Sequence, residues 1–279
     1  MSALLSQDPQ AIMKKAERFL QDQGITSLPV NPRFIAEKLG VVVRAKADSE
    51  PGVSGMLLRN GNEFGILYAT HVPSEGFQNF SIAHELGHYL LDGHYENIFR
   101  DGTGVHASRA GFVSIERFET EADFFAAGLL MPDPMFTKAL NREGDGLEGI
   151  IALAGLCRTS LTATAIRFVQ KTSAPVAVVM STGDQIDFFL MSEAMREFPD
   201  LSWPRKGEPL PKGVATVLFN QDPRNILNAK QEHNDENLQQ WFGGSRRLEV
   251  VEEIIGLGRY EKTLTVITAS NFADDEDED

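Results

Sequence analysis

The alternation of apolar and polar residues divides the chain into a helix-rich first part and a strand-rich second part. In the first part, apolar residues recur every three or four positions in two segments, which is the period of an amphipathic helix. Runs rich in apolar residues follow, and two of them flank Asn60-Gly61, a dipeptide typical of tight hairpin turns. The predicted elements are helices at residues 8–24 and 32–40 and strands at residues 41–44, 53–58 and 64–69.

A further helical pattern, at residues 80–91, contains the sequence His84-Glu85-Leu86-Gly87-His88. Two histidines four residues apart lie on the same face of a helix, so both imidazoles can bind one metal ion. Glu85 then projects beside that ion, where it can accept a proton from water. An amphipathic helix with two partly exposed histidines is the alternative. Gly87 favours a site, because glycine costs a helix roughly 1 kcal/mol relative to alanine and a purely structural helix gains nothing from it.

A catalytic zinc ion usually has three protein ligands and one open position for water, so a third ligand is expected downstream. Residues 116–132 have the apolar period of a well-buried helix that stops at Pro132. Glu119 and Asp123 lie one turn apart beside its buried face, where carboxylates are costly unless they bind a cation or a hydrogen-bond donor. We assign Glu119 to the zinc, and Asp123 to the far ring nitrogen of one of the two histidines.

Two other acidic residues of the same segment have different expected roles. Glu116 is a weaker alternative for the third ligand. Glu121 points to another face of the helix and is expected to be solvated.

These two helices resemble those of the ImmA/IrrE-type metallopeptidases, which are bacterial and phage proteins with a thermolysin-like zinc core. The resemblance covers residues 10–195 in element order and rests on His84-Glu-Leu-Gly-His88 and Glu119-x-x-Ala-Asp-x-Phe-Ala-Ala-x-Leu-Leu-Met-Pro132. It departs at Gln78-Asn79-Phe80, where family members often carry an arginine before the phenylalanine. The resemblance implies the same roles as the pattern: His84, His88 and Glu119 as zinc ligands, Glu85 as catalytic base and Asp123 as an orienting residue.

The expected fold is α+β, with a zincin-like metallopeptidase core that combines a small antiparallel sheet and two metal-binding helices. Zinc would polarise the scissile carbonyl while Glu85 transfers a proton from water to the leaving amine. In zinc peptidases of this type an edge strand commonly aligns the substrate, and residues 64–69 are a candidate, with a merely structural hairpin as the alternative. A donor for the oxyanion is expected on the loop between the metal helices, with four candidates: His94, Tyr95, His106 and Arg109.

Beyond residue 133 the pattern predicts further helices and then a second, strand-rich α+β domain. Residues 149–156 and 161–171 have a helix–turn–helix rhythm, which we interpret as a helix pair that closes the peptidase core. The predicted division is a zinc metallopeptidase domain at 1–173, a strand-rich domain at 174–270 and a disordered acidic tail at 271–279. In the second domain, strands are predicted at 176–180, 186–191, 215–219, 247–252 and 263–268, and a helix at 225–241.

Composition excludes several other classes of protein. The chain has 279 residues, a net charge of −14 and a single cysteine, Cys157, which we expect to be a buried thiol. One cysteine excludes an internal disulfide framework and fits a reducing cytoplasm. The acidic charge argues against direct binding to nucleic acid, which depends on Lys and Arg. Because no apolar run of about 18 residues and no leader peptide is visible, we expect a cytoplasmic protein without membrane association.

Two functions from different classes fit these features. The first is a cytoplasmic zinc-dependent endopeptidase with a narrow protein substrate, which the family resemblance implies to be a DNA-binding repressor of helix–turn–helix type. The second is a regulatory or antitoxin-like binding module that retains the zinc peptidase fold and docks a partner. Glu85 favours the first, because a pure binding module needs no base beside the zinc.

Overall fold

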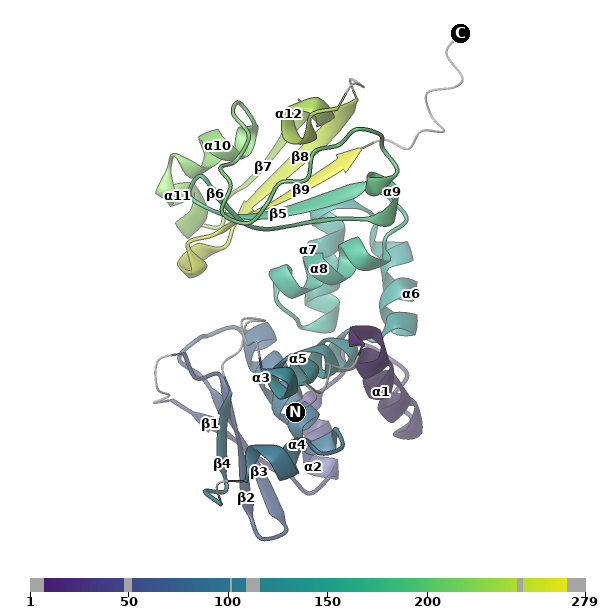
Figure 1. Ribbon diagram of the computed structural model, residues 1–279, viewed down its shortest axis with the longest axis vertical. Coiled ribbons are helices and arrows are strands. Elements are labelled where there is room, and N and C mark those ends of the chain that lie inside the picture. The colour runs from purple at the N-terminus through teal and green to yellow at the C-terminus, as the bar shows by residue number, and fades with distance from the viewer. Residues whose placement is uncertain (1–7, 48–51, 101, 109–115, 245–247, 270–279) are drawn as a thin grey trace, which may run out of the picture. The chain divides into compact units, whose positions relative to one another are not determined.

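The computed structural model describes residues 8–47, 52–100, 102–108, 116–244 and 248–269 (Figure 1). The chain forms two compact units, of which the first comprises residues 1–138 and 154–160 and the second residues 139–153 and 161–279. This division differs from the boundary at residue 173 expected from sequence. The acidic tail and Arg109 lie outside the described residues.

The first unit combines helices with a small sheet. Each of its first two helices begins with a proline next to a capping side chain, since Asp8 accepts from the backbone N–H of Gln10 and Asn31 from that of Phe34. The elements are α1 (Pro9–Asp22), α2 (Pro32–Lys38), β1 (Val42–Lys46), β2 (Gly55–Asn60), β3 (Glu63–Ala69), α3 (Glu75–Leu90), α4 (His94–Ile98), β4 (Val105–Ser108) and α5 (Arg117–Leu130).

The four strands of the first unit lie in the order β1-β3-β2-β4. β2 is antiparallel to both β3 and β4, whereas β1 is parallel to β3. The prediction of a purely antiparallel sheet was therefore wrong, because the neighbouring strands β1 and β3 run in the same direction. The hairpin itself is present, but Asn60 pairs with Glu63, so Gly61-Asn62 forms its turn.

Helices α3 and α5 pack closely through small residues. A Cβ atom added to Gly87 on α3 would lie 3.1 Å from the Cα of Ala122 on α5, so glycine allows a closer approach than a larger residue would. On the other side of α5, a Cβ added to Gly128 would lie 2.8 Å from the Cα of Met13 on α1. α3 also packs against β2 and β3, so it lies between the sheet and α5 (Figure 1).

The helical segment that follows α5 belongs partly to each unit: α6 (Asp133–Glu143), α7 (Gly146–Cys157) and α8 (Leu161–Lys171). Residues 154–160 belong to the first unit because they contact the start of α3. The Asn79 amide donates to the Arg158 carbonyl over 3.1 Å, and a Cβ on Gly76 would lie 2.5 Å from the Ser160 nitrogen. Asn79 thus has a structural partner in this chain.

Neither the first nor the second unit contains a described helix that is long and apolar enough to cross a membrane by itself. The bent pair α7 and α8, at 114°, meets that test on length and composition alone. Ile150, Leu153 and Phe168 of this pair are fully buried within the protein.

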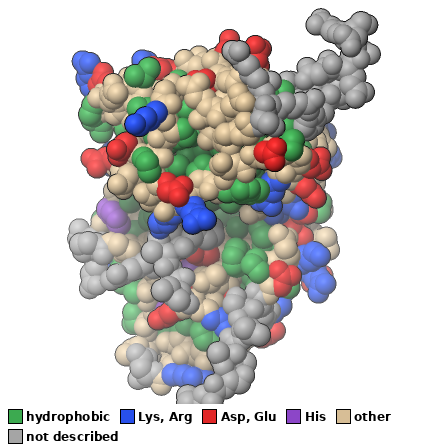
Figure 2. All heavy atoms as spheres, turned by 45° about the horizontal axis from the view of Figure 1, so that its top comes forward, with side chains coloured by type: hydrophobic (Ala, Val, Ile, Leu, Met, Phe, Trp, Pro, Cys, Tyr) green, Lys and Arg blue, Asp and Glu red, His purple; other side chains and the backbone are tan. Residues whose placement is uncertain are grey.

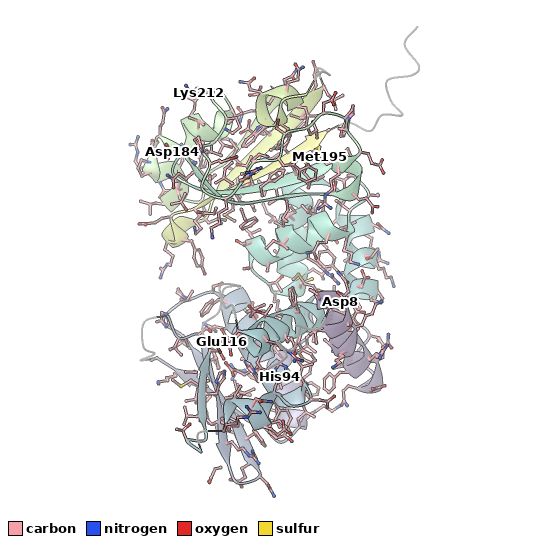
Figure 3. All side chains as sticks on the ribbon, in the orientation of Figure 1. Asp8, His94, Glu116, Asp184, Met195 and Lys212 are labelled. Carbon is pink, nitrogen blue, oxygen red and sulfur yellow. The ribbon has the colours of Figure 1, made fainter. Side chains whose placement is uncertain are left out.

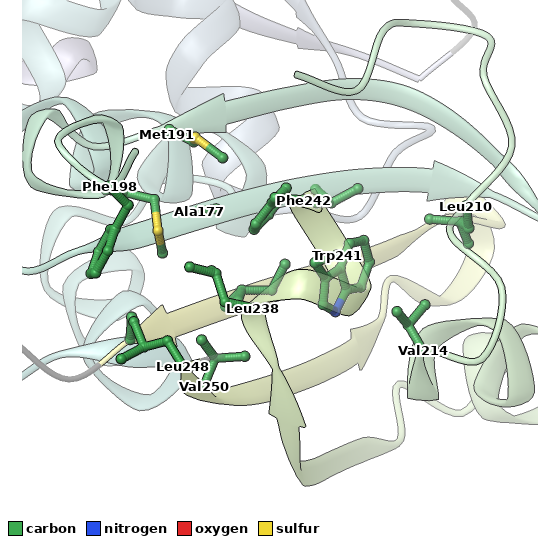
Figure 4. Packing of buried hydrophobic residues seen from close by; sticks show 14 of the residues in the cluster. Ala177, Met191, Phe198, Leu210, Val214, Leu238, Trp241, Phe242, Leu248 and Val250 are labelled. Atoms are coloured by element: carbon green, nitrogen blue, oxygen red, sulfur yellow. The ribbon is translucent and has the colours of Figure 1, made fainter. Parts of the chain in front are cut away.

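The second unit contains a five-stranded antiparallel sheet in the order β6-β5-β9-β8-β7. Its main core forms over one region of this sheet, where Trp241 and Phe242 pack against Ala177, Leu238 and Val250 (Figure 4). The elements are β5 (Val176–Thr182), β6 (Gln185–Met191), α9 (Glu193–Arg196), α10 (Ala215–Asn220), α11 (Pro223–Leu227), β7 (Gln231–Asn237), α12 (Leu238–Phe242), β8 (Glu249–Gly256), η1 (Gly258–Tyr260) and β9 (Thr263–Ala269).

Two predicted elements of this unit were wrong. Residues 215–219 form helix α10 because the buried carboxylate of Glu252 accepts from the backbone N–H groups of Ala215 and Thr216 at its start. The helix expected at 225–241 is instead α11, strand β7 and α12. β7 is entirely polar because it is an edge strand, so it carries little of the apolar alternation that identifies a strand.

Candidate metal centre

Helices α3 and α5 bring His84, His88 and Glu119 together. One ligand atom from each residue lies within 4.8 Å of the others. The Nε2 atoms of the two histidines are 3.1 Å apart, and the carboxylate oxygens of Glu119 lie 3.4 Å from His84 Nε2 and 3.2 Å from His88 Nε2. The three side chains therefore converge on one point.

Asp123 holds the other ring nitrogen of His84. Its Oδ1 atom lies 2.8 Å from His84 Nδ1, and the Asp123 residue is only 3% exposed. An acceptor at this position keeps Nδ1 protonated, so the neutral imidazole directs the lone pair of Nε2 at the cluster.

Glu85 lies directly beside these side chains and is fully buried. Neither of its carboxylate oxygens has a hydrogen-bond partner within the described part of the chain. Its end faces strand β2, where a Cβ on Gly55 would lie 2.6 Å from Glu85 Oε1. Burial raises the pKa of Glu85 to about 7, although the nearby His84 opposes this. Such a carboxyl group exchanges protons readily near neutral pH.

Burial and hydrogen bonds strongly shift the pKa values of the three side chains in the metal-free cluster. Burial alone would lower the pKa of His84, but hydrogen bonds to Asp123 and Glu119 outweigh it and raise that pKa to about 10. Burial lowers the pKa of His88 to about 3. Despite burial, hydrogen bonds from His106 and the two other histidines hold the pKa of Glu119 well below its usual range. In the metal-free protein, protonated His84 thus carries positive charge between the carboxylates of Asp123 and Glu119. A divalent metal ion bound there would carry more positive charge.

The donor set fits zinc. Two imidazole nitrogens and one carboxylate are the protein ligands of a common class of catalytic zinc site. A buried carboxylate such as Glu85, which has no hydrogen-bond partner among the described residues, is costly unless something else at the site interacts with it. The cluster is therefore a candidate zinc site with a buried acid–base group beside it.

The two other acidic residues of α5 differ from each other. Glu116 is exposed at the N-cap of α5 and is absent from the convergent group. Glu121 is only 1% exposed, so the prediction that it is solvated was wrong. Its carboxylate accepts from Arg117 Nε at 2.7 Å and lies 3.1 Å from His94 Nε2. The reason is that α5 is buried on several faces, which the periodicity of a single apolar stripe understated.

Among the described candidates for oxyanion stabilisation, His106 reaches the cluster, with its Nε2 atom 2.9 Å from Glu119 Oε1 and its side chain 19% exposed. His94, labelled in Figure 3, is 1% exposed, and its ring contacts the far side of His88 instead. Tyr95 packs edge-on against another aromatic ring, with centroids 5.6 Å apart. Strand β4, which carries His106, was missed from sequence because its four residues are too short to show a period.

Comparison with known proteins agrees with this geometry. Residues 36–168 match the IrrE N-terminal-like domain, a peptidase family. Over this part the chain is similar to the ImmA/IrrE family. The matched region contains both metal helices and therefore all three convergent side chains.

A curated relative is the radiation response metalloprotease IrrE of Deinococcus radiodurans, which is 29% identical over 99 residues. The match covers 36% of this chain but only 29% of that relative. A solved structure of a Mycobacterium tuberculosis transcriptional regulator superposes with a TM-score of 0.57 at 14% identity, covering 93% of this chain and 76% of that one. At that identity the likeness shows a shared fold, and its coverage extends beyond residues 36–168.

Proposed function

We propose that this chain is a zinc-dependent endopeptidase that cleaves a specific DNA-binding repressor of helix–turn–helix type and thereby switches gene expression. The observation that supports the enzymatic part is Glu85, a buried carboxylate beside the convergent ligands that has no hydrogen-bond partner in the described part of the chain. A site that only held a structural metal would have no use for such a residue, because structural zinc is usually enclosed by four protein ligands.

The chemistry divides among the residues of the chain. Bound zinc would supply Lewis-acid chemistry, since it polarises a carbonyl oxygen and lowers the pKa of water towards 7. His84, His88 and Glu119 hold the ion, and Asp123 orients His84. Glu85 accepts the proton of the attacking water and donates it to the leaving amine, two roles that a pKa of about 7 suits. His106, on the exposed side of the cluster, is our candidate for donating to the oxyanion.

Strand β4 is our candidate for aligning an extended substrate. The strand order places β3 between β1 and β2, so the earlier expectation that residues 64–69 align the substrate was wrong. β4 lies at the edge of the sheet, and His106 from this strand contacts the ligand Glu119. A peptide that added to β4 through backbone hydrogen bonds would therefore run past the metal ligands.

The regulatory part of the proposal has indirect support. The curated relative is described as a radiation response metalloprotease and the structural neighbour as a transcriptional regulator. With a net charge of −14, this chain is suited to meet a basic DNA-binding protein and ill suited to bind DNA itself. On the face shown in Figure 2, Lys and Arg side chains are interspersed with acidic ones. A cytoplasmic location is part of the same proposal.

The deciding experiment incubates the purified full chain, loaded with zinc, with repressors encoded near its gene. We expect one or few cuts in one repressor, no comparable degradation of casein, and no cleavage by the Glu85→Gln variant with its zinc retained. Exposed His71, outside the site, offers a matched control in His71→Asn, which should cleave normally. Equal effects of wild type and Glu85→Gln on repressor-controlled expression in cells would instead support the antitoxin-like docking module.

A further inference from the structure

The loop after α3 brings a further histidine, His94, next to the ligand His88. Gly93 has a φ of +79°, a left-handed conformation suited to glycine, and His94 follows it at the start of α4. His94 is 1% exposed, and its Nδ1 atom lies 3.3 Å from Nδ1 of His88. Its other nitrogen, Nε2, lies 3.1 Å from Glu121 Oε2.

We propose that His94 is a positioning residue for the zinc ligand His88, connecting it to the buried carboxylate of Glu121 as Asp123 connects directly to His84. This inference rests on the proposed zinc site. It assigns His94 and Glu121 to the support of the metal centre, in place of the oxyanion and solvent roles expected from sequence.

The direction of each hydrogen bond follows from the chemistry of the atoms. His88 presents Nε2 to the ligand cluster, so a neutral His88 that binds metal through Nε2 carries its proton on Nδ1. The ionised Glu121 carboxylate can only accept, so His94 carries a proton on Nε2. His94 Nδ1 then keeps its lone pair and accepts from His88 Nδ1.

The remaining contacts hold this arrangement in place. Arg117 Nε donates to Glu121 Oε1 over 2.7 Å, which leaves Oε2 of the same carboxylate for His94. The ring of Phe118 packs edge-on against His94 with centroids 4.9 Å apart. Glu121 is 1% exposed, and a carboxylate this deeply buried is expensive unless it is paired. Hydrogen bonds thus connect Arg117 through Glu121 and His94 to Nδ1 of the ligand His88.

Three substitutions of His94 separate positioning from packing. Asn places an acceptor where Nδ1 was and should keep zinc affinity within about fivefold of wild type. Gln reaches the Nε2 position and Leu supplies only volume, so both should weaken zinc binding by roughly 10- to 100-fold, the usual size of losses behind a ligand. Affinity is measured by competition with a chromophoric chelator on the full chain. His71→Leu, at an exposed histidine, is the control and should not change it.

A second readout is independent of affinity and of activity. Long-range ¹H–¹⁵N correlation spectra of zinc-loaded wild type should show His88 protonated on Nδ1, and His94 protonated on Nε2 alone. A doubly protonated His94, or a His94 protonated on Nδ1, overturns the proposal even if His94→Leu fails to fold. So does unchanged zinc affinity in folded His94→Leu or His94→Gln. If folded wild type binds no zinc, or His84→Ala binds it equally well, the proposed zinc site itself is wrong.

Discussion

Gly55 on β2 and Glu85 on α3 occupy adjoining space, because a Cβ atom at residue 55 would lie 2.6 Å from Glu85 Oε1. A side chain at residue 55 would therefore overlap with the carboxylate of Glu85. Glycine avoids this overlap because it has no Cβ atom. Since Glu85 is fully buried, its carboxylate has little freedom to move aside without changing its distance to the ligands.

We therefore expect Gly55→Ala to displace the catalytic base while leaving the metal ligands in place. Proteolytic turnover should fall by at least about tenfold, since misplacement of a reacting group by an ångström can cost more than that. Zinc content, measured by atomic absorption, should stay near that of wild type. Gly155→Ala is the control, because a Cβ there meets no atom within 4 Å. Full activity of Gly55→Ala would show that Glu85 does not act from its present position.

Zinc binding should strengthen with pH. The pKa of His84 is raised to about 10 because its hydrogen bonds to Asp123 and Glu119 outweigh the effect of burial. Zinc must displace the His84 proton, so its apparent affinity should rise by up to about tenfold per pH unit between pH 7 and pH 10. Chelator competition at several pH values measures the slope, and Asp123→Asn should flatten it. An affinity independent of pH in this range would contradict the expected proton release.

The stability of the metal-free protein should fall as pH rises, whereas zinc affinity should increase. His84 is protonated in the folded state up to about pH 10, whereas its ordinary pKa is 6.5. Its contribution to folding is complete below the ordinary value and disappears as pH rises through about 10. Chemical denaturation with chelator present should show stability falling from pH 8 to pH 10, and less so in His84→Asn. Glu85 and His88, with pKa values of about 7 and 3, do not change protonation there.

Gly87→Ala tests the contact between the metal helices. A Cβ at this position would lie 3.1 Å from the Cα of Ala122, so α3 and α5 must move apart by a few tenths of an ångström. Overpacking costs about 1–3 kcal/mol, while alanine returns about 1 kcal/mol of helix propensity. We expect a net loss of at most about 2 kcal/mol in unfolding experiments, together with weaker zinc binding. Stability and zinc affinity both equal to wild type would show that the contact does not set the ligand spacing.

Cys157 should be unreactive in the folded protein. The residue is fully buried, and burial raises the pKa of its thiol to about 12. Because only the thiolate reacts, Ellman's reagent at pH 8 should label the native chain slowly and the denatured chain at once. Labelling of one thiol per native chain within seconds would contradict this burial.

The sequence was most informative where helical spacing alone, or the cost of burying a carboxylate, determined a residue's position. His84 and His88 are fixed by helical spacing, and Glu119 and Asp123 by the cost of carboxylates beside a buried face. The structure brings all four together. The roles of these residues in catalysis remain predictions.

What the sequence did not predict depends on contacts between distant segments. Glu121 is buried because His94, 27 residues away, returns to α5, and no local pattern carries that information. Thr216 lies in a helix because Glu252, 36 residues later, accepts from its backbone. β7 is a polar edge strand whose position follows from β8 and not from its own composition.

The two compact units are interleaved along the chain, which passes between them at residues 138, 153 and 160. No single cut in the polypeptide separates them, so neither unit is encoded as one continuous segment. Transfer of the metal centre to another protein would therefore require residues 154–160 to travel with it, and a gene fragment that ends before them would encode an incomplete unit.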